Sequence, residues 1–215
     1  MFLFTTVNIK KSCCNEVGSW KDYFSYKSAK KVISNNSNVY CVTDKGLYSY
    51  NILNNEFLLI NKLNYANDFG IEDVGFKDNL IILSYENCNI DIIDETNTKS
   101  ISDIKSQEII GKKINSLTVI ENDLYVSCSF GLIKINLLKK EISETYYIYK
   151  NNERLKINDC KKIDEYFLIA SNKGVFKASE NSLLNNPDSW IHLDTNSNAT
   201  KIIDGPKIIF FYKNN

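Results

Sequence analysis

The chain has 215 residues, of which 43% are hydrophobic and 24% charged, a balance typical of a globular protein of one or two domains. Lys plus Arg number 26 and Asp plus Glu number 26, so the formal net charge is zero, without the basic excess that is usual in nucleic-acid-binding proteins. The pairs Lys139–Lys140 and Lys161–Lys162 are expected to be solvated turns. Neither a nucleic acid nor another partner held by overall charge is indicated.

The sequence has no apolar run of 18 residues, so we expect no membrane span. The first twenty residues, MFLFTTVNIKKSCCNEVGSW, lack the basic, apolar and small-residue order of a signal peptide. We therefore expect residues 1–17 to be a poorly ordered leader without an export signal.

An aromatic cluster follows the leader. The segment GSWKDYFSYKSAKKVI, residues 18–33, contains Trp20, Tyr23, Phe24 and Tyr26. Aromatic residues ahead of a repeat array indicate a capping or ring-closing strand. The alternative is an aromatic patch that binds a glycan or a peptide, because Trp and Tyr are enriched at interfaces. Capping is the favoured interpretation.

A repeated unit accounts for most of the remaining chain. Its central turns lie at Gly46, Asn89, Gly131 and Gly174, which are spaced by 43, 42 and 43 residues. A second landmark recurs upstream of three of these turns, in the strings IEDVGF, INSLTV and INDCKK, also 43 residues apart. Such constant spacing indicates one small structural unit repeated along the chain.

Each unit contains four short, strand-like runs. In the third unit they are INSLTVI, DLYVSCSF, LIKINLL and ISETYYIY, rich in β-branched and aromatic residues. Helical turns are expected only near residues 181–187. Alternation along the third run predicts two faces of a sheet, with Leu132, Lys134 and Asn136 on one and Ile133, Ile135 and Leu137 on the other.

Four strands every 42–43 residues predict an all-β fold, a β-propeller with four-stranded blades. The period and strand content exclude leucine-rich and helical repeats. We expect residues 18–215 to form a partial propeller of about four and a half blades, the N-terminal part of a larger protein. The expected blades are approximately 29–70, 71–113, 114–156 and 157–198, with part of a fifth at 199–215.

The turn residues are expected to build the fold without chemistry of their own. Gly46, Gly131 and Gly174 each lie between two strands, and glycine reaches the positive φ of a tight hairpin without steric strain. In the second unit the segment Asn87 to Asn89, with the turn position at Asn89, replaces glycine, because asparagine tolerates positive φ better than most residues.

No catalytic, cofactor-binding or metal-binding residue is predicted. The chain lacks GxSxG, GxGxxG, P-loop and HExxH motifs, and none of its six cysteines forms a CxxC pair. Cys41, Cys88 and Cys128 lie in apolar runs and are expected to be buried, inert thiols. The single histidine, His192, is expected in an outer strand of the fourth blade.

Acidic residues recur along the units. They are expected to accept hydrogen bonds from turn amides, and a pair of glycosidase-type carboxylates remains an alternative that no single pair favours. These residues are Asp73, Asp91, Asp94, Asp103 and Asp159.

Four strings carry a family resemblance: GSWKDYFSY, VYCVTDKGLYSYN, YENCNIDIID and SFGLIKINLLKKEISETYYI. Their order and spacing resemble the N-terminal β-propeller of the PorZ family, components of the type IX secretion system of Bacteroidetes. Residues 85–91 and 130–136 look like its second and third blades. The resemblance runs from about residue 18 to at least residue 148. Similar blades occur in sensor propellers of two-component regulators.

The resemblance implies a non-enzymatic scaffold or binding module at the outer membrane, cell surface or periplasm. Its implied partners are other type IX secretion components, including a sortase, and anionic lipopolysaccharide. The second propeller and sorting domain of the family are missing from this chain, and no contacting residue can be transferred. The alternatives are a ligand-sensing propeller of a two-component receptor and, less favoured, a propeller hydrolase or lyase.

Overall fold

The computed structural model describes residues 28–35, 37–94, 97–194 and 198–213. Four sheets have four strands each. The first two are β1 (Ala29–Asn35), β2 (Asn38–Thr43), β3 (Leu47–Asn51) and β4 (Glu56–Ile60), then β5 (Ile71–Lys77), β6 (Leu80–Tyr85), β7 (Ile90–Ile93) and β8 (Thr98–Ile101). The next two are β9 (Ile114–Ile120), β10 (Asp123–Cys128), β11 (Gly131–Asn136) and β12 (Glu141–Tyr146), then β15 (Ile157–Ile163), β16 (Tyr166–Ser171), β17 (Gly174–Ser179) and β18 (Ile191–Asp194).

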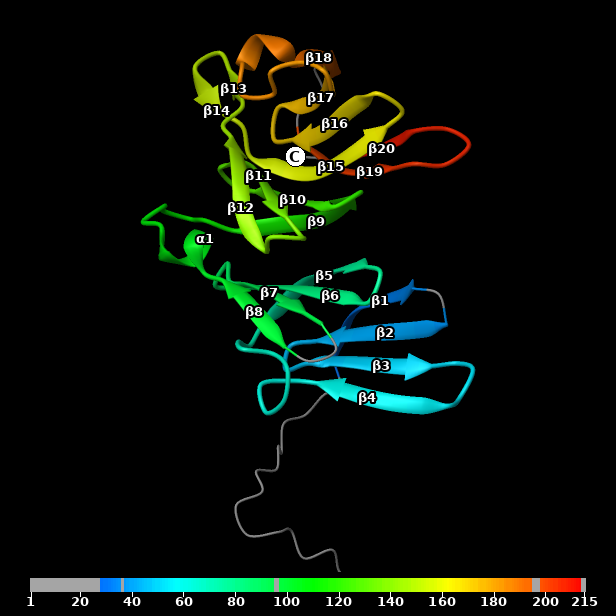
Figure 1. Ribbon diagram of the computed structural model, residues 1–215. Coiled ribbons are helices and arrows are strands. Elements are labelled where there is room, and N and C mark those ends of the chain that lie inside the picture. The colour runs from blue at the N-terminus through cyan, green and yellow to red at the C-terminus, as the bar shows by residue number, and fades with distance from the viewer. Residues whose placement is uncertain (1–27, 36, 95–96, 195–197, 214–215) are drawn as a thin grey trace, which may run out of the picture.

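Within each sheet the strands pair antiparallel in chain order. A fifth sheet has two strands, β19 (Ala199–Ile203) and β20 (Ile209–Tyr212). Figure 1 shows the sheets following one another from blue to orange, with the β19–β20 hairpin in red beside β15 and β16. This arrangement confirms the predicted incomplete β-propeller.

The first strands of successive sheets contact one another, β5 with β9, β9 with β15 and β15 with β19. Side chains on these inner strands bind the neighbouring backbone. Thr118 Oγ1 donates to the carbonyl of Cys160 (2.8 Å), and Asn158 Nδ2 donates to the carbonyl of Ala199 (2.7 Å). The hydrogen bonds therefore join separate sheets as well as strands within a sheet.

Two of the recurring aspartates also join neighbouring sheets. Asp73 Oδ2 accepts from the backbone N–H of Leu117 (3.0 Å), and Asp159 Oδ2 accepts from that of Ile202 (3.0 Å). The expectation of turn amides was therefore wrong for these two residues, whose partners are strand amides of the next sheet. Asp94 does meet it, because its Oδ1 accepts from the N–H of Asn97 (2.8 Å).

The hydrophobic core is divided into four clusters, one between each pair of successive sheets. Alternation along a strand sends neighbouring side chains to different clusters. In β6, Ile82 packs toward the third sheet and Leu83 toward the first. Because the middle sheets are covered on both faces, their central strands are apolar almost throughout.

The alternation predicted for β11 separates the two clusters in the same way. Ile133 and Ile135 pack against the second sheet, whereas Leu132 packs toward the fourth. Lys134 follows Leu132 on that face and is half-buried.

Some local features differ from expectation. Lys161 and Lys162 lie within strand β15, so the expectation of a turn there was wrong. An additional hairpin, β13 (Tyr149–Lys150) and β14 (Glu153–Arg154), lies in the sequence between the last strand of the third sheet and the first strand of the fourth. The 3-10 helix η1 (Pro187–Ser189) begins at the end of the segment where helical turns were expected.

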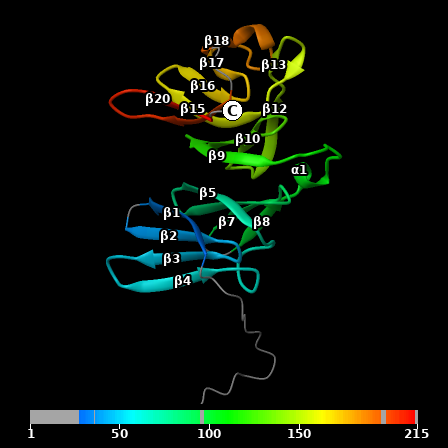
Figure 2. The same cartoon turned by 180° about the vertical axis from the view of Figure 1, so that it is seen from behind.

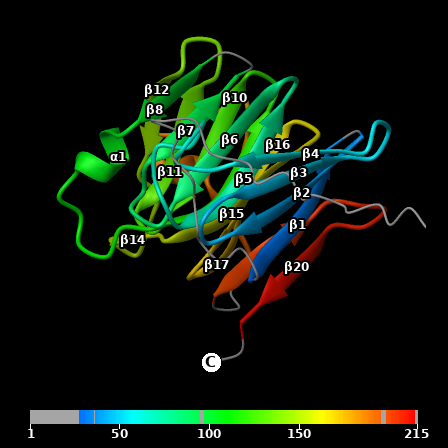
Figure 3. The same ribbon diagram turned by 90° about the horizontal axis from the view of Figure 1, so that it is seen from below.

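A short unpredicted helix, α1 (Asp103–Ser106), leads from β8 toward β9. Figures 1 and 2 place it on the opposite side of the sheets from the β19–β20 hairpin, and the view from below in Figure 3 agrees.

The central turns are of more than one kind. Gly131 and Gly174 have φ values of 145° and 105°, a region that favours glycine. Gly46 is not among the described residues with positive φ, and in the second unit Cys88 (65°), not Asn89, takes this conformation. The expectation of positive φ at Gly46 and Asn89 was therefore wrong.

The first turn has three residues between its strands. The Thr43 side chain closes it, since Oγ1 donates to the carbonyl of Gly46 (2.8 Å) and accepts from the N–H of Gly46 (3.2 Å). Ser171 Oγ makes the same bond to the carbonyl of Gly174 (2.8 Å), so this contact does not account for the different φ at Gly46.

The array is open at both ends. Val32 and Phe57 of the first sheet are 65% and 75% exposed, and Phe211 of the last hairpin is 47% exposed. No core cluster of the described residues joins the first sheet to the β19–β20 hairpin.

Truncation of Leu83 tests the core between sheets. Leu83→Ala should lower the free energy of unfolding by about 2–5 kcal/mol, because Leu83 is fully buried between two sheets. Leu138→Ala is the matched control, since Leu138 is 75% exposed and its loss should change stability by less than about 0.5 kcal/mol. Urea unfolding measures both, and equal effects would contradict packing between sheets as the main source of stability.

Substitution at Gly131 tests the turn geometry. A Cβ atom there would lie 2.5 Å from the carbonyl oxygen of Tyr146, at a φ that side chains rarely adopt. Gly131→Ala should therefore destabilise the chain by about 2 kcal/mol or more. Gly205→Ala is the control, because its nearest neighbour would be 3.8 Å away. Thermal unfolding of the two variants should differ, and similar midpoints would exclude the clash.

Candidate functional site

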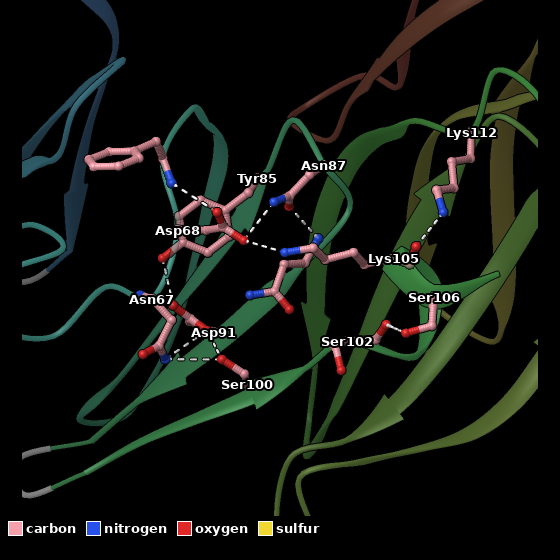
Figure 4. Close-up of polar contacts among 12 residues, drawn as sticks. Asn67, Asp68, Tyr85, Asn87, Asp91, Ser100, Ser102, Lys105, Ser106 and Lys112 are labelled. Atoms are coloured by element: carbon pink, nitrogen blue, oxygen red, sulfur yellow. Dashed lines mark hydrogen bonds and ion pairs between the residues drawn. The ribbon is translucent and has the colours of Figure 1, made fainter. Parts of the chain in front are cut away.

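A polar network surrounds the buried carboxylate of Asp91 in β7 (Figure 4). Asp91 Oδ2 accepts from the hydroxyl of Tyr85 (2.6 Å) and from the backbone N–H of Asn67 (2.7 Å). Asp91 Oδ1 accepts from the Ser100 hydroxyl and from Asn67 Nδ2 (3.3 Å). Four donors thus compensate the burial of this charge.

Strand pairing explains why these side chains meet. Asp91 and Ser100 are direct partners across β7 and β8, so they lie on one face of the second sheet. Tyr85 ends β6 on the same side, in the core cluster that faces the first sheet. Asn67 belongs to the connection between the two sheets, which the network holds in place.

A second group of contacts lies next to it. Asp68 Oδ2 accepts from Asn87 Nδ2 (2.6 Å) and from Lys105 Nζ in α1 (2.8 Å). Burial acts to raise the pKa of Asp68, but the hydrogen bonds from Lys105 and Asn87 outweigh it and hold that pKa below its usual value. The contacts join the connection before β5, the turn after β6 and helix α1 (Figure 4).

The chemistry of the network is that of a structural anchor. Burial, and then the hydrogen bond to Asp91, raise the pKa of Tyr85, so its hydroxyl keeps its proton and donates. Both Asp91 oxygens are already occupied by donors. Neither group is available as a base or a nucleophile, and the arrangement positions a loop.

His192 lies in β18, an outer strand of the fourth sheet, as expected. Its ring stacks on Phe176, with centroids 4.3 Å apart, and its Nε2 lies 2.9 Å from the carbonyl oxygen of Lys173. These contacts occupy the ring in packing and in one backbone interaction.

The cysteines of the described residues are free thiols. Cys88, Cys128 and Cys160 are buried, and burial raises the pKa of each, so they resist forming the reactive thiolate. Cys41 is only half-buried. Within the described parts of the chain, no three His, Cys, Asp or Glu side chains are grouped as metal ligands.

The predicted turn and aromatic residues do not form one site. Gly131 and Gly174 begin strands β11 and β17 in two different sheets, and Gly46 precedes β3 in another. Trp20, Tyr23 and Tyr26 lie outside the described residues, so their role as a cap or a binding patch stays a prediction.

A cavity between the third and fourth sheets was not predicted. It has a volume of about 320 Å³, and its walls include Tyr125, Tyr146 and Phe167. Lys134 Nζ lies 3.1 Å from Asp123 Oδ2 on one wall, where the sheets separate. We call this space the inter-sheet cavity.

The repeat itself carries a signal for this cavity. Tyr125 stands 43 residues after Ile82, and Lys134 stands 42 residues after Ile92. Ile82 and Ile92 fill the preceding gap between sheets as buried core residues. A tyrosine and a lysine at positions equivalent to these isoleucines therefore give this gap a more polar lining than its neighbour.

Among the described residues, no helix has the length and apolar character needed to cross a membrane. The sequential four-stranded sheets define the chain as a β-propeller protein. Residues 39–191 match the family model of the N-terminal β-propeller domain of PorZ of the type IX secretion system. The chain belongs to this family.

Solved structures show the same fold. PorZ of Porphyromonas gingivalis, described as an essential bacterial surface component of the type IX secretion system, superposes with a TM-score of 0.74 at 23% identity. The match covers 86% of this chain and 25% of PorZ, so the chain spans about a quarter of that protein.

More distant propellers match less well. The extracellular domain of a putative one-component system from B. thetaiotaomicron gives a TM-score of 0.56 at 15% identity, covering 74% of this chain and 22% of that one. The AfRom2 CNH domain gives 0.57 at 14% identity, covering 92% and 68%. A search of curated protein sequences gives no significant match.

Removal of the Tyr85 hydroxyl tests the anchor. Tyr85→Phe should destabilise the chain by about 1–3 kcal/mol, because a buried carboxylate loses one donor. Tyr50→Phe is the matched control, since Tyr50 bonds Asn55 at the surface and its loss should change stability by less than about 0.5 kcal/mol. Chemical unfolding measures both, and an unchanged midpoint for Tyr85→Phe would show that the anchor is not structural.

Proposed function

We propose that the chain is a non-enzymatic propeller module of a type IX secretion and cell-surface attachment complex. The observation that carries this proposal is the family match over residues 39–191, supported by the TM-score of 0.74 to PorZ. The non-enzymatic part of the proposal is in keeping with the bond between Tyr85 and Asp91 and with the raised pKa values of the buried thiols of Cys128 and Cys160.

The proposed location is the outer membrane surface, and the proposed partners are other type IX secretion components and lipopolysaccharide. The description of PorZ as a surface component supports the location. Binding of lipopolysaccharide is the finer part of the proposal, and it needs a test separate from that of the protein partners.

The ligand-sensing propeller of a signalling receptor is the weaker alternative. Its support is a shared fold at 15% identity with the extracellular domain of a putative one-component system, without a family match. Since many unrelated functions use the propeller fold, the family match outweighs the fold alone.

Crosslinking in the source organism tests the protein partners. The protein that carries this chain is epitope-tagged at its own locus, crosslinked in intact cells and identified together with its neighbours by mass spectrometry. We expect type IX secretion components to be enriched over an untagged strain. Enrichment of a histidine kinase without those components would instead favour the sensor.

Co-sedimentation tests the lipid. The purified chain is mixed with phospholipid vesicles that contain or lack lipopolysaccharide. Binding that requires lipopolysaccharide would support the finer proposal. Equal sedimentation with both vesicles would contradict it and leave the protein partners unaffected.

A further inference from the structure

The inter-sheet cavity holds more negative than positive charge. Four of its lining residues are acidic, Glu121, Asp123, Glu144 and Glu180, and two are basic, Lys134 and Lys162. Each lysine lies between two carboxylates. Lys134 Nζ is 3.1 Å from Asp123 and 3.9 Å from Glu144, and Lys162 Nζ is 3.5 Å from Glu121 and also contacts Glu180. The lining of the cavity therefore has two more carboxylates than lysines.

Tyr125 provides an independent polar group in the same cavity. Its side chain is 5% exposed, and its ring packs on Phe167 with centroids 5.0 Å apart. The Tyr125 hydroxyl has no hydrogen-bond partner among the described residues. Its oxygen is nevertheless not one of the inaccessible polar atoms that lack a partner, so it is accessible from outside the protein. The hydroxyl is therefore open to the cavity that Tyr125 lines.

Burial, and then the negative charge of Asp123, raise the pKa of Tyr125. The phenol thus stays protonated beside these carboxylates, with lone pairs free to accept. Burial of a hydroxyl without a hydrogen bond from the protein costs free energy unless a ligand or water supplies that bond.

We propose that the inter-sheet cavity binds an arginine side chain of a partner polypeptide. The guanidinium offers five donors in one plane, stacks on aromatic rings and suits bidentate contact with carboxylates. Tyr125 and Phe167 supply the aromatic wall, Ile120 and Leu184 the apolar surface for the stem, and Glu144 the negative charge.

Size and sign favour this occupant. A volume of about 320 Å³ is at the lower end of ligand pockets, and it fits one long side chain better than a large ligand. Its excess of carboxylates disfavours an anionic headgroup. The inference therefore differs from lipopolysaccharide binding and does not depend on the proposed secretion role.

Nuclear magnetic resonance of the full 215-residue chain, labelled with ¹³C in its tyrosine rings, tests the proposal. The probes are the peptide acetyl-Gly-Arg-Gly-amide and its citrulline analogue, which has the same shape without the charge. We expect saturable shifts of the Tyr125 and Tyr146 rings with the arginine peptide. The citrulline peptide should bind at least about tenfold more weakly, as for loss of charge-assisted hydrogen bonds.

Variants assign the binding to the cavity. Tyr125→Phe and Glu144→Gln should each weaken binding of the arginine peptide about fivefold or more, measured on the Tyr146 ring. Tyr125→Phe should keep the melting temperature of the native chain, because its hydroxyl has no partner to lose. Tyr50→Phe and Glu56→Gln, in the first sheet, are the matched controls and should bind as the native chain does.

Three results would overturn the proposal: shifts that do not saturate, equal binding of the citrulline peptide, or unchanged affinity in both cavity variants. If Tyr125→Phe does not fold, Glu144→Gln decides, since Glu144 is partly exposed at the cavity rim.

Discussion

Face-to-face packing between successive sheets is the interaction on which the rest of this structure depends. A four-stranded sheet of this size has two apolar faces, and each must be covered by a neighbour. The four separate core clusters show that the hydrophobic effect acts in the gaps between sheets and not in one central core. The constant repeat length follows, because each unit must present the same two faces at the same spacing.

Polar groups fix the register between the sheets on either side of each gap. Aliphatic packing alone tolerates sliding, whereas a hydrogen bond from Thr118 to the backbone of the next sheet requires one register. Asp91 and Tyr85 act similarly on the connection between the first two sheets. The gap between the third and fourth sheets departs from this pattern, because Tyr125 and Lys134 replace aliphatic residues and leave a charged cavity. The same architecture thus supports gaps lined by aliphatic side chains and a gap lined by charged ones.

The fold was predictable because its determinants are periodic. The sequence shows strand-like runs every 42–43 residues, and it shows turn glycines at positions 131 and 174. Both are local properties of the chain. The backbone conformation of Gly46 was not predictable, because the same side-chain contact closes its turn and that of Gly174, and only Gly174 has positive φ. The pair Lys161–Lys162 is predicted as a turn from its charge, but charge alone does not distinguish a turn from a strand. In β15 the charge of Lys162 is paired with Glu180. The cavity depends on which residues of two sheets face each other, and that is a property of the assembled fold.

The number of core clusters that hold each described sheet implies that local stability varies along the array. Each middle sheet is held by two core clusters, but the β19–β20 hairpin is held by one, against β15 and β16. In such a one-dimensional stack, a unit with fewer contacts opens more readily than one that is held on both faces. The amide protons of the last hairpin and of the first sheet, each held by one core cluster, are then expected to exchange with solvent before those of β6 and β10. Within the described residues, the sheets that have a neighbour on each face are therefore the ones that should resist local opening most.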